Sequence, residues 1–196
     1  MKELTRETVV FLVEEESAEQ MLSVIMPRLL EATGKADNVA YQILPFQGKS
    51  DLEKKLLRRL RGWRKPESRF VIIRDQDSGD CRLVKEKLIQ LCKAAGKPDC
   101  LVRIACHELE SFYLGDLAAV EAGLSVNGLG QRQRRKKYRA PDSIASPSHE
   151  LKRLTEKRYQ KISGSRAISP HLDLDNNKSH SFNVLIEGIR RLIEDN

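Results

Sequence analysis

The segment Arg69–Asp77, R-F-V-I-I-R-D-Q-D, decides the fold class of this chain of 196 residues. Its centre, Phe70–Ile73, is a short apolar run without alternation, which is typical of a strand buried on both faces in a parallel sheet. The run stops at the acidic stretch Asp75–Asp80, D-Q-D-S-G-D. The segment therefore predicts a buried parallel strand that ends in carboxylates.

Three further apolar runs predict strands, and helical patterns separate them. These strands are expected over Thr8–Val13, Val39–Phe46 and Cys100–Cys106. Apolar residues recur at helical spacing around Met21–Leu29, over about Ser50–Trp63 and around Leu83–Leu91. Pro27 lies inside the first helix, so a kink or an early end is expected there. The alternation predicts an α/β fold: a roughly four-stranded parallel sheet flanked by helices.

The pattern changes beyond residue 115. Helices are expected at Ala118–Leu124, His149–Tyr159 and Phe182–Ile193. Asn127–Asp142 is rich in Gly, Arg and Lys and has no periodicity, so we expect a loop there. The predicted organisation is an α/β domain over residues 1–115 and an α-helical extension with a basic loop over residues 116–196. The extension either packs on the sheet or forms a small lobe.

Composition indicates a soluble globular protein. Lys and Arg number 35 against 28 Asp and Glu, a net charge of +7, and 40% of residues are apolar, which excludes a disordered chain. No apolar run approaches the roughly 20 residues of a membrane-spanning helix, and the charged N-terminus has no apolar signal segment. The four cysteines contain no C-x-x-C pair, so no zinc site is expected. We therefore expect a cytoplasmic protein with reduced thiols and no membrane association.

Carboxylates follow three of the four predicted strands. Glu14 follows the first, Asp75 and Asp77 the third, and Glu108 and Glu110 the fourth. Since the carboxyl ends of parallel strands meet at one sheet edge, we expect these acids to converge. Clustered carboxylates repel one another unless a cation lies between them, and sites made of oxygen ligands alone suit Mg²⁺ or Mn²⁺. Such a metal would position a phosphodiester and generate hydroxide from bound water.

Other interpretations of the acids stay open. Any single cluster is also typical of helix N-caps and first-turn acids, as Ser17, Asp80 or one of Glu14–Glu16 would be. His107 is expected to be structural, since carboxylates already satisfy a hard ion. A phosphoacceptor receiver domain also gathers acids at this edge. The Lys that such a domain carries at a late strand end has no clear counterpart here.

Two basic segments are candidates for binding a phosphate backbone. One lies in the second predicted helix, where the alternative is a solvated helix face. The other is Arg132–Arg139, which has an interleaved tyrosine and no acid, and which could instead dock on an acidic partner. The expected nucleic-acid contacts are Arg58, Arg59, Arg61, Arg132, Arg134, Arg135, Lys136 and Lys137.

The ordered acidic motifs resemble a known group. Val13-Glu14-Glu15 and Asp75-Gln76-Asp77, each at a strand end, look like the Glu and D-x-D signature of the TOPRIM domain. The whole chain more closely resembles a bacterial family of TOPRIM-like proteins, relatives of OLD-family and RloB-like nucleases. That family has the motifs V-E-G-x-[ST]-E, D-Q-D and R-E-L-E-[AS]-[WF], the last appearing here as His107–Phe112, H-E-L-E-S-F. Matching C-terminal residues include Pro141-Asp142 and Ser179–Phe182.

The resemblance implies a nuclease or nuclease-like effector that cleaves DNA or RNA. It implies Mg²⁺ or Mn²⁺ held by Glu14, Asp75 and Asp77, with Glu108 and Glu110 completing the catalytic acids. Members of the family are often encoded beside an ABC-type ATPase in loci associated with defence against phage. An ATPase and a nucleic acid are therefore the implied partners.

The chain departs from the family pattern at one position. Glu15 stands where the family has Gly, a residue that permits close backbone approach. This departure motivates the alternative function, a non-catalytic regulatory or adaptor subunit of an ATPase complex.

Overall fold

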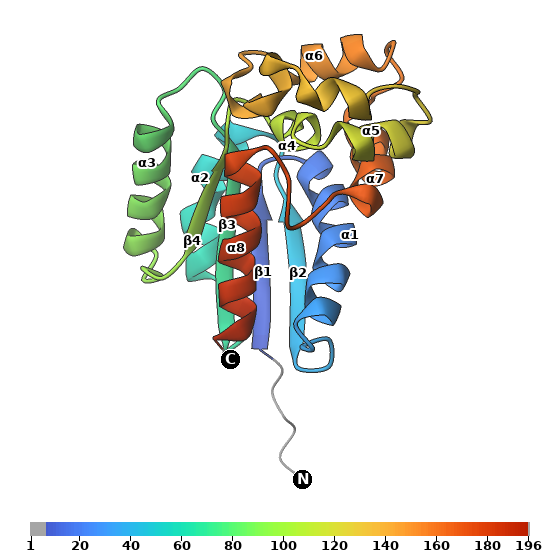
Figure 1. The fold of residues 1–196 in the computed structure, drawn as a ribbon. Coiled ribbons are helices and arrows are strands. Elements are labelled where there is room, and N and C mark those ends of the chain that lie inside the picture. Colours follow the sequence, from blue (N-terminus) through green and yellow to red (C-terminus); the bar gives the residue numbers. More distant parts are fainter. Residues whose placement is uncertain (1–6, 196) are drawn as a thin grey trace.

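The computed structural model describes residues 7–195, in which four parallel strands form the central layer of a three-layer α/β structure (Figure 1). The strands pair in the order β2-β1-β3-β4, all of them parallel. They are β1 (Glu7–Val13), β2 (Val39–Pro45), β3 (Ser68–Asp75) and β4 (Leu101–Ala105). The predicted fold class is therefore confirmed. Residues 1–6 of the charged N-terminus, where no signal segment is expected, lie outside the described residues.

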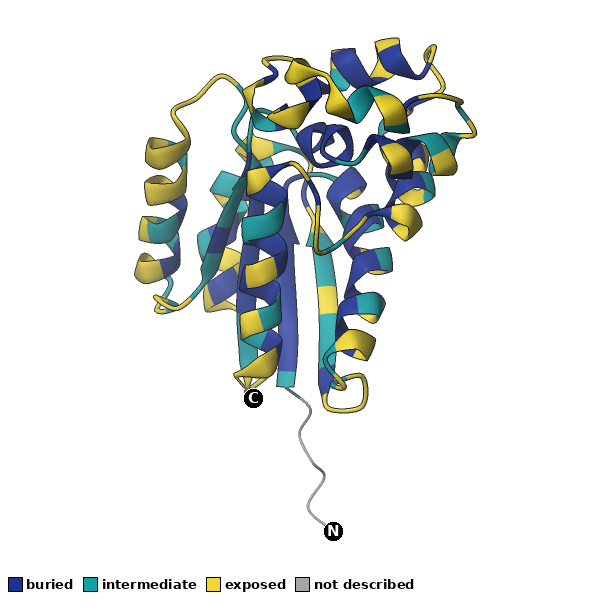
Figure 2. Ribbon diagram, in the orientation of Figure 1, coloured by how far each residue is buried: buried dark blue, intermediate teal, exposed yellow. Residues whose placement is uncertain are grey.

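Helices cover both faces of the sheet. On one face α1 (Glu16–Ala32) and α8 (His180–Glu194) pack against β1 residues such as Val9 and Phe11. On the other face α2 (Lys49–Arg61) and α3 (Cys81–Ala94) pack against Val10 and Leu12. Figure 2 shows the resulting buried centre. The unbroken apolar runs of the strands follow from this burial on both faces.

Helix α1 continues through Pro27, so the expected early end is wrong. A proline inside a helix loses one backbone hydrogen bond and costs about 3 kcal/mol. Buried residues lie on both sides of it, Met21 and Leu22 before and Leu29 and Leu30 after, and their burial stabilises the whole helix. The helix ends at Ala32, and Gly34 follows the C-cap Thr33 with φ +67°, a left-handed conformation that glycine adopts without strain.

The direction of travel across the sheet reverses between β1 and β3. The chain first passes from β1 to its neighbour β2, and then crosses back over β1 to reach β3. Open α/β sheets bind ligands beyond the carboxyl ends of their strands at such a topological switch point. Glu14 follows one of the two flanking strands and Asp75 ends the other.

The C-terminal extension lies over the carboxyl ends of the strands before α8 returns along the sheet (Figure 1). Its helices before α8 are α5 (Leu117–Leu124), α6 (Pro147–Leu154) and α7 (Lys161–Ile168), and the short α4 (Glu110–Leu114) precedes them. The expected loop at Asn127–Asp142 instead contains three short 3₁₀ helices, η1 (Gly130–Arg134), η2 (Lys136–Arg139) and η3 (Pro141–Ser143). The side chain of Gln133 holds this segment together by donating to the carbonyls of Leu114 (3.2 Å) and Tyr138 (2.5 Å).

The extension shares one apolar cluster with the sheet. Tyr138, Leu151 and Tyr159 belong to the same buried cluster as Val13 and Ile73. The division at residue 115 stays a prediction, but the core continues across it. No helix among residues 7–195 is long and apolar enough to cross a membrane.

Candidate active site

Glu14 and Asp75 meet at the switch point. The backbone N–H of Glu14 donates to the carbonyl of Ile73 (3.1 Å), which extends the pairing of β1 with β3 by one residue. The Glu14 side chain then turns toward β3, where its Oε2 accepts a hydrogen bond from the backbone N–H of Asp75 (3.0 Å). The Glu14 carboxylate is thereby held against the backbone of Asp75, close enough for its charge to raise the pKa of the Asp75 carboxyl.

A buried arginine supports Glu14 from the neighbouring position on β3. Arg74 Nε lies 3.9 Å from Glu14 Oε2, and its Nη2 lies 3.6 Å from Oε1 of Glu53 on α2. Burial raises the pKa of Glu14, the hydrogen bond from Asp75 lowers it, and the charge of Asp77 raises it. The net result is a pKa above the usual range, despite the arginine.

Asp77 lies just outside the strand, and a lysine contacts its carboxylate. Its backbone has φ +55° and donates to the carbonyl of His107 (2.7 Å), which itself has φ +58°. Lys49 Nζ, from the first residue of α2, lies 2.8 Å from Asp77 Oδ2. Since β3 ends at Asp75, strand alternation no longer aims Asp77 in the same direction as Asp75. The two acids of the D-Q-D motif thus have different surroundings.

Glu110 approaches the site from below the extension. Its side chain is buried, Oε1 accepts a hydrogen bond from the hydroxyl of Tyr159 (3.0 Å), and Oε2 is buried without a hydrogen-bond partner. Burial is the main reason that its pKa is raised. A buried carboxylate oxygen without a partner is costly, so this atom calls for a proton or a cation.

Asp75 is the most perturbed acid of the group. Burial raises its pKa well above the usual range, and the charges of Glu14, Glu110 and Glu15 raise it further. Lys161, at the start of α7, partly offsets this repulsion and pairs with Glu15 at 2.8 Å. Partial burial would lower the pKa of Lys161, but the acids around it raise the value overall.

Glu108 has a structural contact in this structure. Its Oε2 accepts a hydrogen bond from the backbone N–H of Ser148 (2.7 Å) in the first turn of α6, as a capping acid would. Asp80 likewise caps α3, accepting from the backbone N–H groups of Arg82 and Leu83 (2.8 and 3.1 Å). The capping interpretation therefore describes Asp80 and the present contact of Glu108, but not Glu14 or Asp75. Glu110 is a first-turn acid of α4 that also bonds Tyr159.

The side chains of this site have the right chemistry for a hard cation, but they are not arranged around one ion in this structure. The donors are all carboxylate oxygens, one buried oxygen lacks a partner, and the acids raise one another's pKa values. Within residues 7–195, however, no three His, Cys, Asp or Glu side chains are placed to bind one metal ion. Lys49 contacts Asp77 and Lys161 contacts Glu15, so two ammonium groups supply the counter-charge.

The two predicted basic segments lie in different places. The segment with Arg132 belongs to the extension, over the edge of the sheet where the acids lie (Figure 1). Arg58, Arg59 and Arg61 lie in the last turn of α2. Arg58 lies nine positions after Lys49, which is about 14 Å along the helix away from the acids. Of the two basic segments, the structure therefore brings only Arg132–Arg139 near the edge of the sheet formed by the carboxyl ends of the strands.

Three residues of the site were not assigned to it from the sequence, although Tyr159 matches the C-terminal pattern of the resembled family. Lys161 pairs with Glu15, which lies 146 positions away in the sequence. The hydroxyl of Tyr159 bonds Glu110, which lies 49 positions away. Lys49 stands among other lysines and arginines of a basic helix. Only the packing of the extension on the sheet edge distinguishes these residues from other surface cations and core tyrosines.

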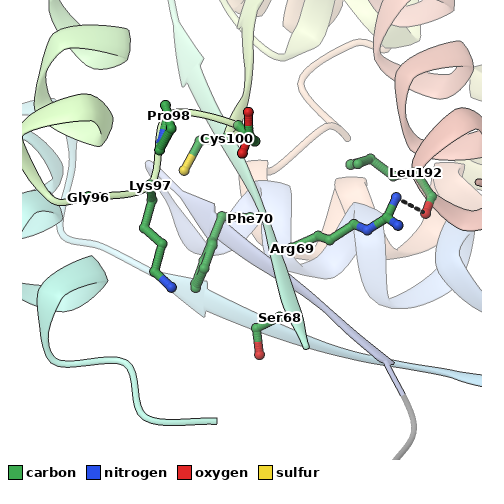
Figure 3. A pocket seen from close by; sticks show the side chains of 9 residues that line it. Ser68, Arg69, Phe70, Gly96, Lys97, Pro98, Cys100 and Leu192 are labelled. Carbon is green, nitrogen blue, oxygen red and sulfur yellow. Dashed lines mark hydrogen bonds between the residues drawn. The ribbon is translucent and has the colours of Figure 1, made fainter. Parts of the chain in front are cut away.

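A separate cavity of about 510 Å³ lies at the opposite, amino-terminal end of β3 (Figure 3). Arg69 donates there to the carbonyl of Leu192 (3.3 Å), and Lys97 Nζ lies 5.4 Å from the centre of the Phe70 ring. Asp99 lines it as well, but none of the clustered carboxylates does. The cavity is therefore distinct from the candidate active site.

Fold and site together define a class: a parallel α/β protein with carboxylates gathered at its topological switch point. Residues 13–190 match the family model described as "Domain of unknown function (DUF4276)", and the chain belongs to this family. The structure is similar to that of the C-terminal region of the Burkholderia pseudomallei OLD protein, with a TM-score of 0.54 and 16% identity. The match covers 94% of this chain and 98% of that one, so the two share a fold. No curated protein matches the chain.

Proposed function

We propose that this protein is a nuclease, a phosphodiester hydrolase of DNA or RNA that depends on Mg²⁺ or Mn²⁺. One observation carries the proposal: Glu14 and Asp75 lie together at the switch point, beside a buried Glu110 with an unpartnered oxygen. Carboxylates that repel one another in a ligand site are expected where a cation binds. The fold shared with the OLD C-terminal region supports the proposal.

Glu14 and Asp75 would hold the metal, and Asp77 would join them on release from Lys49. The bound cation would supply charge neutralisation and an activated water. Lys49 and Lys161 would then be free to contact phosphate oxygens, because the metal replaces them as the counter-charge of the acids. Glu110 would remain fixed by Tyr159, and Glu108 would hold α6 over the site.

The test compares cleavage by variants at matched aspartates. Nicked, linear and single-stranded substrates are incubated with the protein in Mg²⁺ and in Mn²⁺. Asp75→Asn should lower the rate by at least about 100-fold, the scale of losing one electrostatic contact to the transition state. Asp37→Asn, at an exposed turn, should cut like the wild type. Equal cleavage by the Asp75 variant would sink the proposal.

The same site motivates a second candidate, a non-catalytic adaptor. Its supporting observation is that Lys49 and Lys161 already neutralise Asp77 and Glu15. We further propose, on the family resemblance, an ABC-type ATPase as partner and a role in defence against phage. Co-purification with the ATPase, together with no heat of Mg²⁺ or Mn²⁺ binding, would favour the adaptor. Metal binding lost in Asp75→Asn would favour the nuclease.

A further inference from the structure

The net positive charge of this chain comes from one segment. Residues 132–161 contain eleven Lys and Arg against three Asp and Glu, a net charge of +8, whereas the whole chain carries +7. Everything outside this segment therefore sums to −1. The segment runs from η1 to the start of α7, and so belongs to the extension that lies over the acids.

The one buried acid of this segment is neutralised internally. Glu150 accepts a hydrogen bond from the hydroxyl of Tyr138 (2.5 Å) and pairs with Arg153 (2.7 Å) and Lys137 (2.9 Å). These groups outweigh its burial and lower the pKa of Glu150 to about 2. This network joins η2 to α6 and leaves the Arg153 and Lys137 side chains more than half exposed. Helices η2 and α6 thus form one connected surface.

Apart from Lys161, which pairs with Glu15, the other Lys and Arg residues of this segment have no acidic partner among the described residues. No described acid lies within 4.0 Å of Lys152 or Lys157, and the same holds for Arg134, Arg135 and Lys136. Unpaired cations held in a fixed array repel one another, and an anionic ligand would relieve that repulsion. A polyanion would relieve more of it than a single ion.

Two cavities flank α6 on this surface. One, of about 400 Å³, is lined by His149, Lys152, Arg153, Lys157, Tyr159 and Gln160. The second, of about 430 Å³, is lined among others by Lys137 and Glu150. His149 lines both, so they adjoin one another. We name this surface, with Lys137, His149, Lys152, Arg153 and Lys157, the α6 groove.

The α6 groove leads toward the acids. Tyr159 lines its first cavity, and the hydroxyl of this tyrosine bonds Glu110. Lys161 follows two residues later and contacts Glu15, next to the charge of Asp75. The groove and the candidate metal ligands thus lie on two sides of one buried tyrosine, and Lys161 adds a cation beside the acids.

We infer that the α6 groove binds the phosphodiester backbone of a single-stranded nucleic acid and guides it to Asp75. The inference deepens the proposed nuclease function by naming the strandedness of its substrate and the surface that holds it. A single strand is favoured because Glu14 and Glu110 are buried beneath the extension, where a thin chain reaches more readily than a duplex. Since Tyr138 and Tyr159 are also buried, base stacking contributes little.

Binding is measured by fluorescence anisotropy of a labelled 20-nucleotide strand, as DNA and as RNA, in EDTA and in the Asp75→Asn background. Without metal or cleavage, the measurement reports the groove alone. Lys152→Glu with Lys157→Glu should weaken binding at least tenfold and lower the salt slope by about 1.4, for two lost phosphate contacts on a single strand. The matched control Lys85→Glu with Lys93→Glu, on the exposed side of α3, should bind like the parent.

Further arms separate the alternatives. The duplex of the same sequence should bind more weakly than the single strand, and poly-glutamate should not compete at equal charge concentration. Equal loss in the α3 control, tighter duplex binding, or equal competition by poly-glutamate, as an acidic protein partner predicts, would each overturn the inference. The alanine pair Lys152→Ala with Lys157→Ala, expected to give an intermediate loss, guards against misfolding of the Glu variant. If the wild type binds the single-stranded nucleic acid in the groove but cleaves no substrate, the nuclease proposal is contradicted and the binding inference is kept.

Discussion

Replacing Tyr159 by Phe tests how the extension positions the acids. The variant keeps the buried ring but removes the hydroxyl that donates to Glu110 Oε1 at 3.0 Å. Because Oε2 already lacks a partner, both oxygens of a buried carboxylate would then be unsatisfied. A hydrogen bond to a charged group contributes about 1.5–3 kcal/mol, so we expect a loss of about 2 kcal/mol in the free energy of unfolding at pH 8. For a chain of this size that lowers Tm by about 4–8 °C.

The loss should depend on pH with a defined sign. The pKa of Glu110 is raised in the folded protein above its ordinary 4.5. Its folded state therefore binds more protons than the unfolded state, and its contribution to stability falls as pH rises from about 4.5 through the folded pKa. Removing the donor raises that pKa further, so the variant loses more stability at pH 8 than at pH 4, a pH below both the ordinary and the raised pKa of this carboxyl.

Thermal and urea unfolding at the two pH values provide the measurement. Tyr41→Phe, which removes a hydroxyl from a half-buried residue of β2, serves as the control and should change little. An equal loss at pH 4 and pH 8 would show that the hydroxyl acts through packing alone. No loss at either pH would refute the hydrogen bond itself.

Three further outcomes follow from the same contacts. Asp75→Asn should raise Tm at pH 8 and not at pH 4, because it removes a charge repelled by its neighbours; a lower Tm at pH 8 would contradict this. Lys161→Gln should lower the free energy of unfolding by about 1 kcal/mol at low salt and by less in 1 M NaCl, since the pair with Glu15 is partly exposed; an effect independent of salt would argue against the charge. Gly115→Ala should lower the free energy of unfolding by about 1–3 kcal/mol, because a Cβ there would lie 1.9 Å from Asn177 Oδ1 and 2.7 Å from the backbone nitrogen of Ser179. The control Gly130→Ala meets only ordinary contacts and should be near neutral.

The sheet and its flanking helices could be predicted because their signals are local. Runs such as Phe70–Ile73 are apolar throughout, and the structure buries them on both faces. Helix α7, K-I-S-G-S-R-A-I, could not be predicted, since its glycine and serines weaken helical propensity and the pattern lacks a clear apolar stripe. Its Gly164 is needed for contact with Tyr159, whose nearest ring atom would lie 2.5 Å from a Cβ.

The acids of the site were accessible to sequence reasoning for a topological reason. Parallel strands must end at one edge, so Glu14 and Asp75 were expected together, and the structure places them together. The direction of Asp77 depends on a left-handed backbone turn, and the contact of Glu108 depends on where α6 begins. Both are set by tertiary packing, as are the positions of Lys49 and Lys161. Whether these acids bind metal stays a prediction.

Calorimetric titration of Mn²⁺ into the EDTA-treated protein, repeated in two buffers of different ionisation enthalpy, tests the central claim most directly. If Glu14 and Asp75 hold the ion, the ion favours the charged form of Asp75, whose pKa burial and the neighbouring acids raise, so titration at a pH near that pKa should show heat and proton release together. Both should vanish in Asp75→Asn and in Glu14→Gln, and both should persist in Asp37→Asn. Undiminished Mn²⁺ binding by the Asp75 and Glu14 variants, or none by the wild type, would contradict a metal site at the switch point.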